Sequence, residues 1–215
     1  MIPYVVIHTA VSVDCRMDRL DVDMEQYYSL IPTWKEDCTL SSSQTMLQAG
    51  LEEWEHDGSS DPSAPLLAVV DGRGRFNGWK KVAPSPFWRK GVALSTTRTP
   101  KEHLELVRGS GADVIVAGDE HVDLRAALEE LNVRYGVGTV RVDSGGTLNG
   151  VLLRAGLVSE VSMVMQPQLI GGRSPSSFFI ADDLGGGAAM DAELMSVERL
   201  DGGSVWLRYR LKRDQ

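Results

Sequence analysis

Short apolar runs alternate with amphipathic segments along most of the chain. The apolar runs cover residues 2–11, 66–70, 91–94, 113–117 and 139–142, and a shorter strand is expected at 39–41. Segments with apolar residues at helical spacing cover residues 24–34, 100–107, 124–131 and 147–156, and a further helix start is expected at 42–45. Apolar runs of this length are typical of strands that are covered on both faces. Their alternation with helices predicts an α/β fold with a mostly parallel sheet and helices on both faces.

The C-terminal part of the chain has a different pattern. After a strand at residues 158–166, the segments 194–200 and 205–211 alternate between apolar and polar positions. The second segment places Val205, Leu207, Tyr209 and Leu211 on one face, which we expect to be buried. This pair predicts an antiparallel edge at the C-terminal end of the sheet. Polar loops are expected at residues 56–65 and 171–189. The length of 215 residues suits one domain, and the strand–helix pattern continues beyond the loop at 56–65, so residues 1–215 are expected to form a single domain.

The segment 139–156, TVRVDSGGTLNGVLLRAG, combines a strand, a glycine pair and a helix start. Thr147 is a candidate helix cap, and Gly156 is expected to end the helix. A helix N-terminus that follows glycines offers backbone N–H groups and a favourable dipole to an anion. We therefore expect a phosphate to bind at Ser144, Gly145, Gly146 and Thr147. The alternative is an ordinary strand-to-helix turn that binds nothing.

Composition narrows the possible partners. The chain has 215 residues, 42% of them hydrophobic, and a net charge of −8. This charge disfavours nucleic acid and anionic membranes as partners. We find neither an apolar run long enough to cross a membrane nor a signal peptide at the start of the sequence. Cys15 and Cys38 are interpreted as free thiols in a reducing cytoplasm.

The four histidines do not indicate a metal site. His8, His56, His103 and His121 lie far apart and lack ligand spacing, so no metal is expected. His8 interrupts the first apolar run, where a hydrogen-bonded core histidine is a better interpretation than a catalyst. The first strand is not followed by the glycine fingerprint of a standard dinucleotide site, and no phosphate-binding P-loop motif is present.

Polar residues follow several of the expected strands, and ligands bind at the carboxyl ends of parallel strands. Ser95, Thr96, Thr97 and Arg98 follow one strand, and Gly118 follows the next. The guanidinium of Arg98 and the neighbouring hydroxyls suit a phosphate group, although an arginine in solvent is an equally good interpretation. If this cluster binds the 2′-phosphate of a dinucleotide, the protein should prefer NADPH to NADH.

Residues 144–172, SGGTLNGVLLRAGLVSEVSMVMQPQLIGG, closely resemble the reductases of riboflavin biosynthesis. These are the C-terminal domain of the bifunctional deaminase–reductase and its stand-alone relatives. Further matches are Ser12-Val13-Asp14-x-Arg16, Ser43-x-Thr45 and Val70-Asp71-x-Arg73-Gly74-Arg75. Two departures stand out: the family usually has glycine where this chain has Cys15, and an acidic pair with proline where it has Gln48-Ala49-Gly50.

The resemblance implies a dihydrofolate-reductase-like fold, NADPH as hydride donor and a homodimer. It implies as substrate a ribosylamino-pyrimidinone 5′-phosphate that is reduced to the ribityl form. In such folds the backbone of the first strand, here at Ala10, contacts the nicotinamide.

The sequence and this resemblance therefore predict an NADPH-dependent reductase. Asp143 is the catalytic candidate, because it ends the strand that leads into the glycine pair and the family tends to have an acidic residue there. The expected substrate contacts are Ser43 and Thr45, with Asp14 and Arg16 from the first loop. Two alternatives are a pterin reductase, which would use Asp23 or Glu25 of the first helix, and a non-catalytic NADPH-binding dimer.

Overall fold

The computed structural model describes residues 1–50, 54, 59, 61–172, 176–181 and 189–212. The chain forms two compact units. The first comprises residues 1–3 and 36–140, and the second comprises residues 4–35 and 141–215. The single domain over residues 1–215 stays a prediction.

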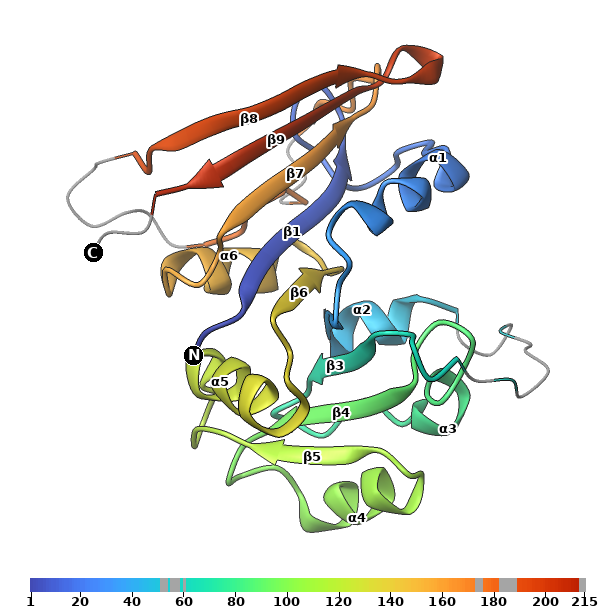
Figure 1. The fold of residues 1–215 in the computed structure, drawn as a ribbon, viewed down its shortest axis with the longest axis vertical. Coiled ribbons are helices and arrows are strands. Elements are labelled where there is room, and N and C mark those ends of the chain that lie inside the picture. The colour runs from blue at the N-terminus through green and yellow to red at the C-terminus, as the bar shows by residue number, and fades with distance from the viewer. Residues whose placement is uncertain (51–53, 55–58, 60, 173–175, 182–188, 213–215) are drawn as a thin grey trace. The chain divides into compact units, whose positions relative to one another are not determined.

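The first unit contains a parallel four-stranded sheet (Figure 1). Its strands are β2 (Cys38–Ser42), β3 (Leu66–Val70), β4 (Lys90–Ser95) and β5 (Asp113–Val116), and they pair in that order. The helices are α2 (Ser43–Gln48), α3 (Trp79–Val82), α4 (Lys101–Gly109) and α5 (Leu124–Tyr135). The expected strands at 39–41, 66–70, 91–94 and 113–117 are thus present, because each apolar run is long enough for one buried strand.

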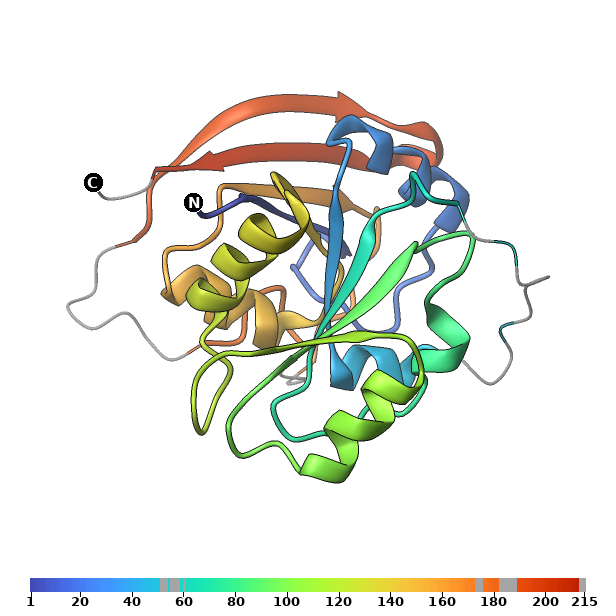
Figure 2. The ribbon, with the colours of Figure 1, turned by 60° about the horizontal axis from the view of Figure 1, so that its bottom comes forward.

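Helices cover both faces of this sheet. Leu67, Val69 and Ala93 point to one face, where they pack with Met46 of α2, Trp79 of α3 and Val107 of α4. The alternate residues Leu66, Ala68 and Leu94 are also fully buried. Figure 2 shows α5 on the opposite face of the sheet from α2, α3 and α4. The predicted coverage of both faces is therefore confirmed in this unit.

The second unit contains β1 (Tyr4–Val11), β7 (Glu160–Met165), β9 (Val205–Leu211) and β8 (Ala192–Arg199), paired in that order. β1 and β7 are parallel, whereas β9 runs antiparallel to both of its neighbours. The predicted antiparallel C-terminal edge is confirmed. Helices α1 (Met24–Ser29) and α6 (Gly146–Arg154) belong to this unit, and the chain passes from the first unit to the second within β6 (Thr139–Val142).

Several expected elements differ in extent. The helix expected at 24–34 ends at Ser29 and is followed by a 3-10 helix, Ile31–Thr33. Pro32 explains the break, because proline lacks the N–H that continues an α-helix. The four-residue helix α3 was not predicted. Residues 56–58 and 60 of the loop expected at 56–65, and residues 173–175 and 182–188 of the loop expected at 171–189, lie outside the described residues.

The expected buried face of β9 was wrong. Val205, Leu207, Tyr209 and Leu211 are only partly buried, whereas Trp206 on the other face is 5% exposed. Trp206 packs with Val6, Tyr27, Trp34 and Val164 in the core of the second unit. The large indole therefore decides which face is covered, against the alternation of smaller apolar residues. The opposite face of the C-terminal hairpin remains apolar and partly accessible.

His8 is a core residue, as expected. Its side chain is 1% exposed, its Nδ1 lies 2.9 Å from the Ser162 hydroxyl, and its ring stacks on Tyr27 at 4.4 Å. The Tyr27 hydroxyl donates to the carbonyl of His8 at 2.8 Å. Burial, and secondarily the positive charge of Arg141, lower the pKa of His8 to about 4. His8 is therefore neutral in the folded protein at neutral pH.

This lowered pKa makes stability depend on pH. Between about pH 6.5 and 4 the unfolded chain protonates this histidine and the folded protein does not, so the free energy of unfolding should fall as the pH decreases through that window. Chemical denaturation at several pH values measures this slope. His8→Phe keeps an aromatic ring but cannot titrate, and it should reduce the slope. An equal slope in both proteins would contradict a neutral, buried His8.

Candidate active site

The turn between β6 and α6 contains the glycine pair. α6 begins at Gly146, and Gly145 occupies the N-cap position with φ −80° and ψ 171° and without a side-chain capping bond. The expectation that Thr147 caps the helix was wrong, since Thr147 lies within the first helical turn. The end is as expected to within one residue: Ala155 is the C-cap, and Gly156 follows with φ 64°. An uncapped helix start leaves backbone N–H groups for a ligand.

The two glycines of the pair have different surroundings. A Cβ on Gly146 would lie 2.1 Å from the carbonyl oxygen of Ser177, whereas a Cβ on Gly145 would have no heavy atom within 4 Å. A Cβ on Gly150 would meet the carbonyl oxygen of Ile180 at 2.1 Å. Gly146 and Gly150 therefore allow the segment 177–180 to pack on α6. Gly145 is the position of the pair that leaves open space for an anion.

Asp143 lies two residues before the glycine pair and forms an ion pair with Arg141. The Arg141 Nη1 lies 2.9 Å from the Asp143 Oδ2. The guanidinium is 5% exposed and the carboxylate 38% exposed, so a buried cation holds a carboxylate that solvent or a ligand can reach. The negative charge of Asp143, after burial, also raises the pKa of Tyr28. Arg141 was not identified from the sequence. Its position two residues before Asp143 was the available signal, because alternate residues of an extended chain lie on the same side.

The loop after β1 contains the expected substrate residues Asp14 and Arg16. Asp14 accepts hydrogen bonds from the Ser12 hydroxyl at 2.7 Å and from the backbone N–H groups of Ile170 and Gly171. These bonds, with Ser12 first, lower the pKa of Asp14 to about 2. Arg16 donates from Nη2 to the carbonyl of Gly172 at 3.3 Å. Both side chains thus join this loop to the segment after β7.

Cys15 occupies the position where the family usually has glycine. Its φ is 57°, in the left-handed region that glycine adopts most easily. The loop therefore keeps a glycine-like backbone with an exposed, free thiol. Ala10, the expected nicotinamide contact, lies one residue before the end of β1 and is paired in register with Val164.

Ser43 and Thr45 lie in the first turn of α2, at the carboxyl end of β2 in the first unit. Ser42 caps this helix by accepting from the backbone N–H of Thr45, and its hydroxyl lies 3.0 Å from the Thr45 hydroxyl. Ser43 is 5% exposed. The expected helix start is confirmed, while the proposed contact with a substrate remains a prediction.

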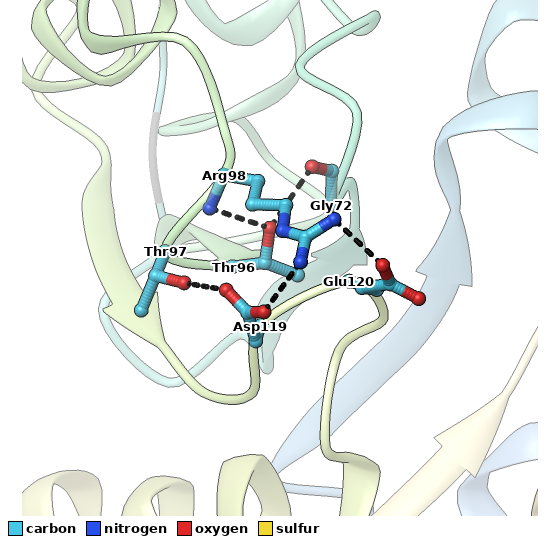
Figure 3. A network of polar contacts seen from close by, with 6 residues as sticks. All are labelled: Gly72, Thr96, Thr97, Arg98, Asp119 and Glu120. Carbon is cyan, nitrogen blue, oxygen red and sulfur yellow. Dashed lines mark hydrogen bonds and ion pairs between the residues drawn. The ribbon is translucent and has the colours of Figure 1, made fainter.

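The expected cofactor residues of the first unit do come together. Thr97 follows β4 and donates its backbone N–H to the carbonyl of Gly118 at 3.1 Å. Thr96 is buried, and its hydroxyl donates to the carbonyl of Gly72 at 3.3 Å (Figure 3). Ser95 is fully buried, and among the described residues its hydroxyl has no partner. Side-chain contact with a ligand is thus left to the exposed Thr97 and Arg98.

Arg98 is already engaged by two carboxylates. Its Nη2 lies 2.9 Å from Asp119, and its Nη1 lies 2.6 Å from Glu120. The Thr97 hydroxyl donates to the other oxygen of Asp119, and this bond, followed by Arg98, lowers the pKa of Asp119. Neither acid was predicted from the sequence, although both directly follow Gly118.

Other site types find little support in the part of the chain that is described. No group of three or more His, Cys, Asp or Glu residues there is arranged to hold a metal ion. None of the helices described is long and apolar enough to cross a membrane. A hollow of about 310 Å³ is lined by Asp21, Gln26, Gln168 and neighbouring residues, which include Asp23 of the pterin alternative. None of the residues expected for the NADPH-dependent reductase lines it.

Comparison with known protein families matches residues 3–205 to the RibD C-terminal domain. A 2,5-diamino-6-ribosylamino-4(3H)-pyrimidinone 5′-phosphate reductase from Archaeoglobus fulgidus is 36% identical over 129 residues, which are 60% of this chain and 57% of that protein. A reductase of the same name from Aquifex aeolicus is 37% identical over 83 residues, 39% of this chain and 37% of that protein. The matched regions thus span less than two thirds of these relatives.

Solved structures agree on the fold. A pyrimidine reductase-like protein from Corynebacterium diphtheriae has a TM-score of 0.75 at 16% identity, with 99% of this chain and 93% of that chain covered. RibD from Acinetobacter baumannii has a TM-score of 0.72 at 20% identity, with 98% of this chain and 58% of that chain covered. The predicted dihydrofolate-reductase-like fold class is confirmed.

Proposed function

This chain belongs to the RibD C-terminal domain family, and we propose from this premise that it is an NADPH-dependent reductase of 2,5-diamino-6-ribosylamino-4(3H)-pyrimidinone 5′-phosphate. The relatives that carry this activity in their names are 36% and 37% identical to the matched parts of the chain. The observation that carries the proposal is the β6–α6 turn. There, a carboxylate held by a buried arginine lies two residues before an open glycine and an uncapped helix start.

The turn fits the diphosphate of a dinucleotide. The backbone N–H groups of Gly145, Gly146 and Thr147 would donate to it, and the helix dipole would favour its negative charge. Bound NADPH would supply the hydride, which is the chemistry of the cofactor itself. The remaining cofactor contacts proposed are Ala10, Ser144 and the Ser95–Arg98 cluster with Gly118.

Asp143 would act on the sugar of the substrate. Its accessible carboxylate would accept hydrogen bonds from the ribosyl hydroxyls or assist proton transfer as the sugar opens and C1′ is reduced. Arg141 would keep this carboxylate in position, because it is buried and bonded to one carboxylate oxygen. Ser43, Thr45, Asp14 and Arg16 are proposed to hold the rest of the substrate.

The alternatives receive less support. A pterin reductase would present Asp23 or Glu25 to the heterocycle, but the carboxylate of Asp23 caps α1 by accepting from the backbone N–H of Gln26 at 2.9 Å. A non-catalytic dimer would differ from the proposed reductase in binding NADPH without oxidising it. The two free cysteines suit a reducing cytoplasm, which we propose as the location.

Gly145→Asp tests the phosphate site. A carboxylate at this open position should repel the diphosphate and lower NADPH affinity by well over tenfold, an estimate of about 1.4 kcal/mol or more. Gly145→Ala is the matched control, since a Cβ alone meets no atom there. Fluorescence titration of NADPH measures both. Equal affinities of the Asp and Ala variants would contradict binding at this turn.

Asp143→Asn tests the catalytic role. The amide keeps the shape of the side chain and removes its charge, so NADPH should still bind while turnover falls by roughly 100-fold or more, the scale of a lost acid–base group. The measurement is NADPH oxidation with the ribosylamino-pyrimidinone phosphate, with dihydrofolate as a control substrate. Unchanged turnover would remove Asp143 from the mechanism, and activity with dihydrofolate alone would favour the pterin alternative.

A homodimer is proposed from the accessible face of the C-terminal hairpin. Leu194 and Val197 of the edge strand β8 are 52% and 55% exposed, and they pair with Tyr209 and Leu207 of β9. An apolar edge of this kind is usually covered by another chain. Light scattering should therefore give twice the monomer mass of 23.5 kDa.

Val197→Lys should shift this assembly toward the monomer, because it places a charge on the apolar face. Glu198→Gln is the control, since Glu198 pairs with Trp206 and lies on the face of the sheet opposite to Val197. A monomeric wild-type protein at micromolar concentration would refute the homodimer.

A further inference from the structure

The cation in the proposed 2′-phosphate site is shared by two acids. Figure 3 shows the carboxylates of Asp119 and Glu120 converging on the guanidinium of Arg98. Each terminal nitrogen has its own partner, at 2.9 Å and 2.6 Å. Thr97, Arg98, Asp119 and Glu120 therefore form one network, which we call the Arg98 cluster.

Buried neighbours hold this cluster in place. The hydroxyls of Thr96 and Thr99 both donate to the carbonyl of Gly72, and the backbone N–H of Arg98 donates to the Thr96 hydroxyl at 3.2 Å. On the other side, Gly118 adopts a φ of 87°, and a Cβ there would lie 2.2 Å from the carbonyl oxygen of His121. This turn requires glycine, and Asp119 and Glu120 follow it directly. The conformation of this turn thus determines the backbone positions of Asp119 and Glu120.

The charged ends themselves are accessible. The side chains of Arg98, Asp119 and Glu120 are 60%, 63% and 65% exposed, so a ligand can reach each of them. The cluster contains one positive and two negative charges. A phosphate monoester such as a 2′-phosphate adds roughly 1.5 to 2 further negative charges at neutral pH. To bind Arg98, the phosphate would have to displace both carboxylates from the guanidinium. It would then lie close to these two negative charges, which would repel it.

A ribose without that phosphate meets a different balance. Its hydroxyls are neutral donors, and carboxylates commonly accept hydrogen bonds from the ribose 2′-hydroxyl in NAD sites. The two acids therefore weaken binding of the 2′-phosphate, whereas they do not weaken, or they strengthen, binding of a free 2′-hydroxyl. Arg98 has the opposite effect, because its positive charge strengthens binding of the 2′-phosphate.

We infer that Asp119 and Glu120 are specificity-determining residues that limit the preference for NADPH over NADH set by Arg98. The inference rests on the proposed function, because it takes the cofactor to be a nicotinamide dinucleotide whose adenosine end reaches the cluster. On this inference, three side chains together set the preference for NADPH over NADH: Arg98 raises it, and the two acids lower it.

The experiment is fluorescence titration of the full chain with NADPH and with NADH. Asp119→Asn and Glu120→Gln should each raise the ratio of NADPH to NADH affinity by about 1.5- to 5-fold, the scale of one exposed charge pair. Arg98→Ala should lower the ratio. Glu129→Gln, an exposed neutralisation on α5, is the matched control and should leave the ratio unchanged. The differences should shrink in concentrated salt, because exposed charges are screened.

Each outcome has one meaning. Ratios that stay unchanged or fall in both neutralised variants overturn the inference while leaving the reductase proposal intact. Failure of the wild-type protein to bind either cofactor overturns the proposed function and the inference with it. Circular dichroism of each variant establishes that it is folded. The Asp119→Asn, Glu120→Gln double variant provides a second measurement, and its ratio should be at least that of either single variant.

Discussion

The close contact between α6 and the segment 177–180 is the constraint on which the β6–α6 turn depends. The Ile180 N–H donates to the carbonyl of Gly146 at 2.9 Å, and the Asn149 side chain donates to the carbonyl of Phe178 at 3.1 Å. A side chain at Gly146 would collide with the carbonyl oxygen of Ser177, and one at Gly150 would collide with the carbonyl oxygen of Ile180. The contact therefore fixes where the helix begins, and with it the direction of the N–H groups proposed to bind phosphate. The glycines of this turn thus have different roles: Gly146 and Gly150 allow close packing, and Gly145 leaves space for a ligand.

Two arginine–carboxylate groups in the protein differ in burial, and they should therefore respond differently to change. Arg141 is largely buried beside Asp143, so loss of the carboxylate removes a partner from a cation with little access to water, which is costly. The Arg98 cluster is exposed and screened, so its charges contribute little to stability and can be redistributed when a ligand arrives. The first arrangement suits a fixed catalytic group, and the second suits recognition of a charged ligand.

The sequence predicted the fold well where a local pattern decides the structure. The strands Leu66–Val70, Thr139–Val142 and Val205–Leu211 have the expected bounds, because apolar runs and alternation report burial within the segment itself. Contacts between distant residues were not predictable in this way. The packing role of Gly146 depends on Ser177, and the partners of Arg98 come from the loop after β5. The orientation of β9 depended on the single large side chain of Trp206.

Transfer of a labelled hydride tests the central claim most directly. The protein is supplied with NADPH carrying deuterium at the transferring position of nicotinamide C4, together with the ribosylamino-pyrimidinone 5′-phosphate. If the chain is the proposed reductase, mass spectrometry and NMR will find one deuterium at C1′ of a ribitylamino product, with one oxidised cofactor for each product molecule. Recovery of the unreduced substrate, with NADPH bound and unoxidised, would contradict the account.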